Sequence, residues 1–450
     1  MSKRDGQRRK TILVLAMPII GGMVSQNVLN LVDTAMVGTL GDQALAAVGT
    51  GSFANFLAIA FITGLSAGVQ AMVARRLGAG RTGEVAVPLN GALILAVMMA
   101  VPASIILYQL VPVAFPVLNR DPAVVAAGVP YLQARLVAMT AVGANFAFRG
   151  YWNGVNMSQM YLRTLLLMHA TNILLNWLLI FGNLGFPELG ATGAGVASAV
   201  ATYVGTAYYI VLALRHARPG GFLRSLPSAT EIRTMLRLSV PNGLQQTSMA
   251  GSLVMLFWII NQLGASSGEV ATAQVAAANV VINVTLVALL PGLGLGITAA
   301  SLVGQALGRR DPEDARRWGW DVARVSAVVL GILGLPMLLA PDLILGVFLH
   351  DPATLDLARG PLRLVGAVMA IDGVGLVFMN SLLGAGASRT VMLVAVAVQW
   401  LLFLPAVYVV GPLLGGDLIA IWVVQTGYRV VLAVVMLLLW RRGAWQSIEV

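Results

Sequence analysis

Two acidic side chains lie well inside long apolar stretches of the sequence. Nearly all of the chain's 18 acidic residues fall near the ends of such stretches, and Asp33 and Asp372 are the exceptions. A charged side chain in hydrocarbon costs about 2.5 to 3.5 kcal/mol on insertion scales, so it usually faces a wet cavity and has a function there. For an isolated carboxyl, that function would be to bind and release a proton or a cation. A neutral Asp hydrogen-bonded between helices is the alternative.

The residues before Asp33 form a polar face. Gln26, Asn30 and Asp33 are spaced at i, i+4 and i+7, so a helix presents them on one side. We expect Gln26 and Asn30 to line a substrate cavity that leads to the carboxyl.

A second polar face contains two asparagines. His169, Asn172 and Asn176 follow i, i+3 and i+7. Amide side chains could bind a cation through oxygen or donate hydrogen bonds to Asp33. Asparagines also hold membrane helices together, which is the structural alternative. His169 is interpreted as a packing residue rather than a proton relay, and Ser198 is a further cavity candidate.

Asp372 has one candidate partner of opposite charge. Arg429 lies in the middle of another apolar stretch. An ion pair between the two would make Asp372 structural, and ion coupling through Asp372 is the alternative. Gln245 and Gln246 follow Pro241 and are uncharged candidates for the cavity.

Composition identifies the class of protein. Hydrophobic residues make up 58% and charged residues 10% of the 450 residues, whereas soluble domains carry about 25% charged residues. The chain is therefore expected to be an integral membrane protein. Its net charge of +10 is interpreted as basic residues gathered at one membrane face, not as a nucleic-acid surface.

Several chemistries are excluded by residue content. The chain has no cysteine, three histidines without metal-ligand spacing, and no GxxxxGK[ST] loop. No nucleophile–base pair suggests an enzyme. A channel is disfavoured because the acids of the two halves are not equivalent. We expect no cofactor and no metal site, except that Na⁺ could bind at Asp33.

Apolar segments of about 20 residues can cross a bilayer, and the sequence contains twelve. They lie at about 12–38, 46–74, 86–112, 125–150, 160–182, 190–214, 236–262, 272–304, 322–348, 357–384, 390–412 and 417–440. The fold class predicted is an all-α polytopic membrane protein.

Basic residues predict the orientation, because Lys and Arg favour cytoplasmic loops. The stretch Lys3–Lys10 precedes the first span, and Arg441 and Arg442 follow the last. Alternate loops are rich in arginine, while the others hold little beyond Arg120 and Arg359. Both termini are therefore expected in the cytoplasm, with the protein in the cell (inner) membrane.

The two halves of the sequence repeat each other. Asp121/Asp351, Gly154/Gly384 and other pairs match at one constant offset, and Pro18/Pro241 match at a slightly shorter one. Six spans in each half predict two pseudo-symmetric lobes related by an axis along the membrane normal. We assign 1–214 to the amino-terminal lobe, 215–235 to a cytoplasmic linker, and 236–450 to the carboxy-terminal lobe.

The chain resembles the multidrug and toxic compound extrusion (MATE) transporters over nearly its whole length. The segments that carry the resemblance are "NLVDTAMVGTLGDQALAAVG" (30–49), "GLSAGVQAMVARRLGAGR" (64–81), "RGYWNGVNMSQMYLRTLLLMHATNILLNWLLIFG" (149–182) and "LGATGAGVASAVA" (189–201). The resemblance implies an antiporter that exports amphipathic cations and drugs against inward H⁺ or Na⁺ flow. Its expected partners are small amphipathic or cationic substrates and the lipid bilayer, and a monomer is expected.

The resemblance also implies roles for individual residues. The family's helix-1 acid falls on Asp33, and its amino-lobe cation site includes the positions of Asn172 and Asn176. Some members carry Asp at the latter position, so Asp33 would be the only acid of the site here. In the family branch with a carboxy-lobe Na⁺ site, the Glu and Tyr partners of Asp372 fall here on Met249 and Val368. That second site is therefore expected to be incomplete.

The principal alternative function is a lipid-linked saccharide flippase of related two-lobed architecture. A polyanionic headgroup would require several arginines in the cavity, and only Arg135, Arg363 and Arg429 are candidates. Both H⁺ and Na⁺ are candidate coupling ions, and the lone acid slightly favours H⁺.

Overall fold

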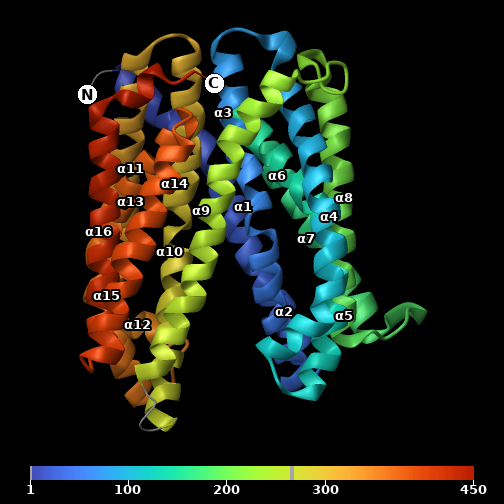
Figure 1. The fold of residues 1–450 in the computed structure, drawn as a ribbon, viewed down its shortest axis with the longest axis vertical. Coiled ribbons are helices and arrows are strands. Elements are labelled where there is room, and N and C mark those ends of the chain that lie inside the picture. Colours follow the sequence, from blue (N-terminus) through green and yellow to red (C-terminus); the bar gives the residue numbers. More distant parts are fainter. Residues whose placement is uncertain (1–2, 264–267, 450) are drawn as a thin grey trace. The chain divides into compact units, whose positions relative to one another are not determined.

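A computed structural model describes residues 3–263 and 268–449, with the side chains of 6–263 and 273–449. Within these residues all regular structure is helical (Figure 1). The principal α-helices are α1 (Lys3–Gly38), α2 (Asp42–Ala60), α3 (Leu65–Gly78), α4 (Val87–Leu118), α5 (Pro122–Val137), α6 (Met139–Gly154), α7 (Ser158–Phe181), α8 (Gly190–His216), α9 (Ala229–Leu263), α10 (Gly268–Gly308), α11 (Pro312–Leu339), α12 (Pro341–Leu345), α13 (Pro352–Gly384), α14 (Ser388–Ala397), α15 (Leu404–Tyr408) and α16 (Leu418–Arg442).

The described residues contain enough apolar helix for the predicted number of spans. Eleven helices are long and apolar enough to cross a membrane, and the bent pair α5–α6 is the twelfth candidate. The region from Ser388 to Leu413 counts as one span, although π-helical turns interrupt α14 and α15. The prediction of an all-α, twelve-span membrane protein is confirmed.

The chain divides into two compact units. Unit 1 contains the residues up to Ile20 and those from Ser248 onward, and unit 2 is Gly21–Thr247. The chain passes between units inside helices: inside α1 just after Pro18, and inside α9 after Pro241. The lobe ranges 1–214 and 236–450 come from the sequence repeat and remain a prediction.

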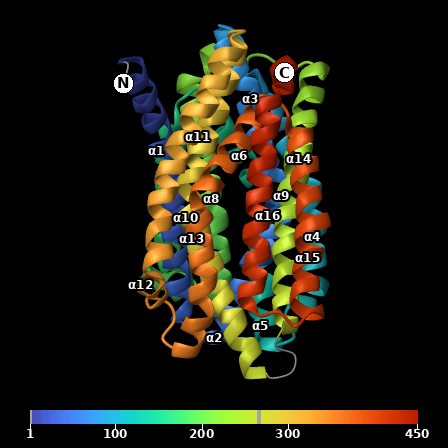
Figure 2. The ribbon, with the colours of Figure 1, turned by 90° about the vertical axis from the view of Figure 1, so that its left-hand side faces the viewer.

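Each unit is built around one central span. In unit 1, α13 packs against α10, α11 and α16 (Figure 2). In unit 2, the α5–α6 pair occupies the corresponding part of the repeat and packs against α2, α3, α4 and α8. The same region of the repeat therefore forms the centre of both units.

The repeat extends to the backbone conformation of turns. Gly80 and Arg310, which occupy equivalent positions of the repeat, have positive φ values of 73° and 59°. Asn156 and Gly386, which match at the same offset, have φ values of 62° and 92°. Because non-glycine residues adopt this conformation uncommonly, its recurrence at Arg310 and Asn156 indicates that the two units share turn geometry.

The start of the central span is capped by an aspartate side chain in both units. The carboxylate of Asp121 accepts a hydrogen bond from the backbone N–H of Ala123 at 2.9 Å, and that of Asp351 accepts one from Thr354 at 2.9 Å. A proline follows each Asp as the first helical residue, where its missing N–H costs nothing. The repeated Asp-Pro pair therefore starts both spans.

The close helix contacts are also repeated. A Cβ added at Gly154 would lie 3.2 Å from the carbonyl oxygen of Gln70, and one at Gly384 would overlap that of Ala300. The two glycines are equivalent in the repeat, and so are their two partners. The glycines therefore permit a close approach of the central span to α3 in unit 2 and to α10 in unit 1.

The central spans differ in one respect, because α5 and α6 meet at an angle of 48° whereas α13 is continuous. A break in a membrane helix leaves carbonyl groups that need other partners. Here the Ser104 hydroxyl donates to the carbonyl of Leu136 at 2.8 Å, and the Tyr203 hydroxyl donates to that of Val137 at 2.9 Å. These two hydroxyls, from α4 and α8, stabilise the bend.

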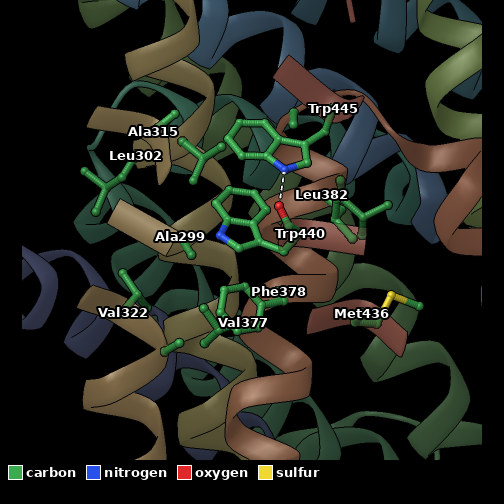
Figure 3. Close-up of a cluster of buried hydrophobic side chains, with 14 of the residues drawn as sticks. Ala299, Leu302, Ala315, Val322, Val377, Phe378, Leu382, Met436, Trp440 and Trp445 are labelled. Carbon is green, nitrogen blue, oxygen red and sulfur yellow. Dashed lines mark hydrogen bonds between the residues drawn. The ribbon is translucent and has the colours of Figure 1, made fainter. Parts of the chain in front are cut away.

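A cluster of buried hydrophobic side chains in unit 1 contains two stacked tryptophans (Figure 3). The rings of Trp440 and Trp445 stack with centroids 4.0 Å apart, and the indole N–H of Trp445 donates to the Trp440 carbonyl at 2.9 Å. Ile12 of α1 is buried in the same cluster. The first turns of α1 and the end of α16 therefore belong to one end of unit 1.

Candidate functional site in unit 2

The Asp33 carboxyl is held by an amide from α7. The Asn176 side-chain nitrogen donates to Asp33 Oδ1 at 2.7 Å. Asn176 is fully buried, and Asp33 is half-buried on α1. The predicted contact between the polar faces of α1 and α7 is present. The group that donates to the carboxylate is a neutral amide.

Asn172, one helical turn earlier, joins the same group. Its amide orientation is assigned from its hydrogen-bond partners. The assignment that satisfies them best directs the nitrogen toward Asp33 Oδ1, at 2.8 Å, and places the oxygen 3.0 Å from the hydroxyl of Ser198. Ser198 comes from α8, and both Asn172 and Ser198 are buried. Three helices thus supply Asp33, two asparagines and a serine to one buried polar cluster.

The polar network continues along α1. The imidazole Nε2 of His169 lies 3.3 Å from the Gln26 side-chain oxygen, and the Gln26 amide donates to Asn30 at 3.2 Å. His169 is buried, while Asn30 is exposed. His169, interpreted from sequence as a packing residue, therefore also makes a polar contact with the face that carries Asp33.

This cluster contains one acid among neutral polar side chains. Asp33 is its only acid, and the amides around it can turn either nitrogen or oxygen toward a ligand. The Arg135 guanidinium also acts electrostatically on Asp33. Among the described residues, no three His, Cys, Asp or Glu side chains gather into a possible metal site.

The second intramembrane acid is paired with a fixed cation. In unit 1, Asp372 Oδ2 lies 3.3 Å from a guanidinium nitrogen of Arg429, and the two side chains are 7% and 14% exposed. The ion pair considered from sequence is therefore present between α13 and α16. The charge of Asp372 is balanced without an external ion.

The remaining predicted residues give Asp372 no second ligand. Val368 is buried and Met249 is 44% exposed, and neither has an oxygen ligand to offer. Gln245 is buried and Gln246 is half-buried on α9, in unit 2 rather than with Asp372.

The sequence was compared with known families. The MatE family model matches this chain twice, at residues 18–178 and 249–409. Together the two matches cover well over half of the chain.

The chain belongs to the MATE family. It is therefore a multi-pass membrane transporter and not an enzyme, as the sequence predicted. The two matches begin at positions 18 and 249, a separation that agrees with the repeat found in the sequence and in the turns. The two pseudo-symmetric six-helix lobes are thereby confirmed.

Curated MATE relatives align over nearly the full length of the chain. A probable multidrug resistance protein NorM from a Synechococcus species is 30% identical over 92% of this chain and 89% of its own length. The protein of the same name from Mesorhizobium japonicum is 26% identical over 97% and 94%.

Solved MATE-type structures show the same fold. A multidrug resistance MATE family transporter in an outward-facing conformation gives a TM-score of 0.88 at 21% identity, covering 98% of this chain and 97% of the other. A transporter of the same superfamily from Pyrococcus furiosus gives 0.85 at 22% identity, with the same coverage.

Sequence reasoning missed two features of this polar cluster. Arg135 was considered only as an anion-binding arginine, although it acts on Asp33. The Gln26–His169 contact joins α1 to α7 and was not expected. In each case a polar residue inside an apolar span was the available signal.

Proposed function

We propose that this MATE transporter is an antiporter that exports amphipathic, often cationic, compounds by alternating access in exchange for H⁺ or Na⁺. Support comes from relatives named as probable multidrug resistance proteins, of which one is 30% identical. The observation that carries the mechanism is the contact of Asp33 with the neutral amides of Asn172 and Asn176.

The amide donors bring no charge to Asp33. Arg135 acts on the carboxylate electrostatically, but none of the ion pairs found among the described residues joins the two side chains. An external cation, a cationic drug or a proton can each neutralise Asp33, but they cannot all do so together. Reciprocal linkage then requires that drug binding expels the proton and that acid weakens drug binding. In the antiport cycle, Asp33 takes up the coupling ion from outside, releases it inside and is then available to the drug.

The proton is the favoured coupling ion. Asn176 supplies no second carboxylate, so a cation site at Asp33 would hold one negative charge only. Na⁺ remains the alternative, because Asp33 and the amide oxygens of Asn172 and Asn176 are the oxygen ligands that hard cations bind.

Asp372 is proposed to have a supporting role. Its pairing with Arg429 leaves no uncompensated charge for a second coupling ion. The same pairing argues against a saccharide-lipid flippase, because it occupies one of the three arginines available for a polyanionic headgroup. Gln26, Asn30, Ser198, Gln245 and Gln246 are proposed to contact the substrate through uncharged polar groups.

The orientation remains part of the proposal. Arg75 and Arg76 end α3, and Arg309 and Arg310 follow α10 at the repeat-equivalent turn. Such arginines favour the cytoplasm. Both termini would then lie inside the cell, with the monomeric protein in the inner membrane.

The coupling ion can be tested with purified protein in liposomes. Uptake of a fluorescent cationic drug is measured with an imposed pH gradient and no Na⁺, and then with a Na⁺ gradient at equal pH. H⁺ antiport predicts transport only with the first gradient. Transport only with the second establishes Na⁺ coupling, and transport with neither gradient contradicts antiport.

A further inference from the structure

One end of unit 1 carries a matched change from basic to apolar residues on two neighbouring helices. On α1, Arg8 and Arg9 are followed one turn later by Leu13. On α11, Arg316 and Arg317 are followed after two turns by Arg324 and then by valines. Such a change is expected where a helix passes from the headgroup layer into hydrocarbon.

A groove lies between these two helices at that level. It has a volume of about 420 Å³. Its lining residues are Arg8, Arg9 and Leu13 from α1, and Asp321, Arg324, Val325, Val328 and Val329 from α11. The exposed fractions are 46% for Leu13 and 62% for Val328, so the apolar part of the groove is open. The lining holds three arginines against one aspartate.

Arg8 is committed to holding the two helices together. Its guanidinium donates to Asp314 at 2.7 Å and to Asp321 at 2.6 Å, and it stacks over the Trp318 ring with its carbon 3.6 Å from the centroid. Asp321, the acid that lines the groove, therefore already has a close basic partner in Arg8.

Arg324 has a different environment. Its side chain is 76% exposed and forms an ion pair with Asp321 at 3.6 Å. This ion pair is longer than a hydrogen bond and open to solvent, so it holds Arg324 only weakly. A second hollow of about 350 Å³, lined by Glu313, Arg316, Arg317, Trp320, Asp321 and Arg324, adjoins it. Arg324 thus stands where the two hollows meet, with further arginines on one side and the valines on the other.

We propose that this groove binds an anionic phospholipid. The phosphate would lie between Arg324 and Arg9, and one acyl chain would follow Leu13, Val325, Val328 and Val329. A ligand that is anionic at one end and apolar along its length matches both parts of the groove, whereas a zwitterionic lipid brings a second positive charge to an already positive site. This inference does not depend on the cargo or the coupling ion.

Native mass spectrometry of detergent-purified protein titrated with dioleoyl phosphatidylglycerol or dioleoyl phosphatidylcholine tests the proposal. Phosphatidylglycerol should bind more tightly, and Arg324→Gln should weaken its binding roughly fivefold, as expected for one surface arginine. Val328→Trp fills the apolar part without changing charge and should also weaken binding. Arg324→Lys should restore most of it.

Matched controls separate this site from general charge effects. Arg218→Gln removes an exposed arginine of unit 2 and should leave phosphatidylglycerol binding unchanged. Equal binding of the two lipids, or equal loss in Arg218→Gln, would overturn the proposal. Competition by glycerol 3-phosphate at concentrations near those of the lipid would also overturn it, because the site would then recognise phosphate without an acyl chain.

Discussion

The side-chain nitrogen of Asn176 donates a hydrogen bond to a carboxylate oxygen of Asp33 at 2.7 Å, and this amide donor is neutral. An arginine or lysine in place of Asn176 would compensate the charge permanently. An amide orients the carboxylate and leaves its charge available to a mobile cation.

The first prediction concerns Asp33→Asn. Affinity for a cationic drug at pH 8 should fall about tenfold to a hundredfold, as expected on losing a hydrogen bond to a charged group. The remaining affinity should not vary between pH 5 and 9, and coupled efflux should be lost. Drug binding to purified protein across this pH range is the measurement.

Asp42→Asn is the matched control, because Asp42 is an exposed acid at the start of α2. It should bind drug with the wild-type pH dependence, tighter at pH 8 than at pH 5. Wild-type affinity that is constant with pH, or coupled efflux that survives in Asp33→Asn, contradicts the proposed exchange.

The Asp372–Arg429 pair should behave as a structural unit. Removing one partner leaves a buried charge uncompensated, at a cost of about 3 kcal/mol. Asp372→Asn and Arg429→Gln should each lower the thermal unfolding temperature in detergent, and the double variant should recover much of the loss. Additive losses in the double variant would show that the pair is not coupled.

Transport should rank the two acids differently. Asp372→Asn should reduce drug transport in liposomes less than Asp33→Asn does, because Arg429, Met249 and Val368 supply no oxygen ligand for a second cation site. The comparison is made at equal amounts of folded protein. Complete loss in both variants would place an essential coupling step at Asp372.

The repeated glycine contacts should differ in their tolerance of a methyl group. At Gly384 the added Cβ meets backbone atoms of Ala300, which cannot rotate away. Gly384→Ala should therefore cost about 1–3 kcal/mol. At Gly154 the closest atom is a side-chain carbon of Val73 at 2.8 Å, so Gly154→Ala should be milder. Thermal unfolding of the two variants decides, and the reverse order would contradict the argument.

Topology can be tested with one cysteine, because the chain has none. Glu188 is exposed in the segment before α8. A cysteine there should react with a membrane-impermeant maleimide added to intact cells. Reaction only after the cells are opened would place the loop inside and reverse the proposed orientation.

The spans and the central polar cluster could be predicted because each follows from local pattern. Apolar length predicted the helices, and helical spacing placed Asn172 and Asn176 on one face. Recognition of the family added the pairing of that face with Asp33, which spacing alone leaves open. The Asp372–Arg429 contact was one of two alternatives, because pairing across helices depends on packing.

The bend at Ala138 could not be predicted in the same way. Neither proline nor glycine stands at the break, and the partners of its freed carbonyls, Ser104 and Tyr203, lie far away in sequence. The boundaries between the two units, which fall inside α1 and α9, could not be predicted either. A sequence repeat identifies equivalent residues, but it does not show where one compact unit ends and the next begins.

The bend also has an electrostatic consequence. Because α5 ends at Val137, the partial negative charge of a helix C-terminus lies in the middle of the span, where Arg135 occupies the last turn. In the continuous α13, the repeat-equivalent position is Val365, which is buried and apolar. The helix end at the break in α5–α6 therefore stabilises the positive charge of Arg135 within the membrane. Arg135 is also the arginine that acts on Asp33, so the two features occur together in unit 2.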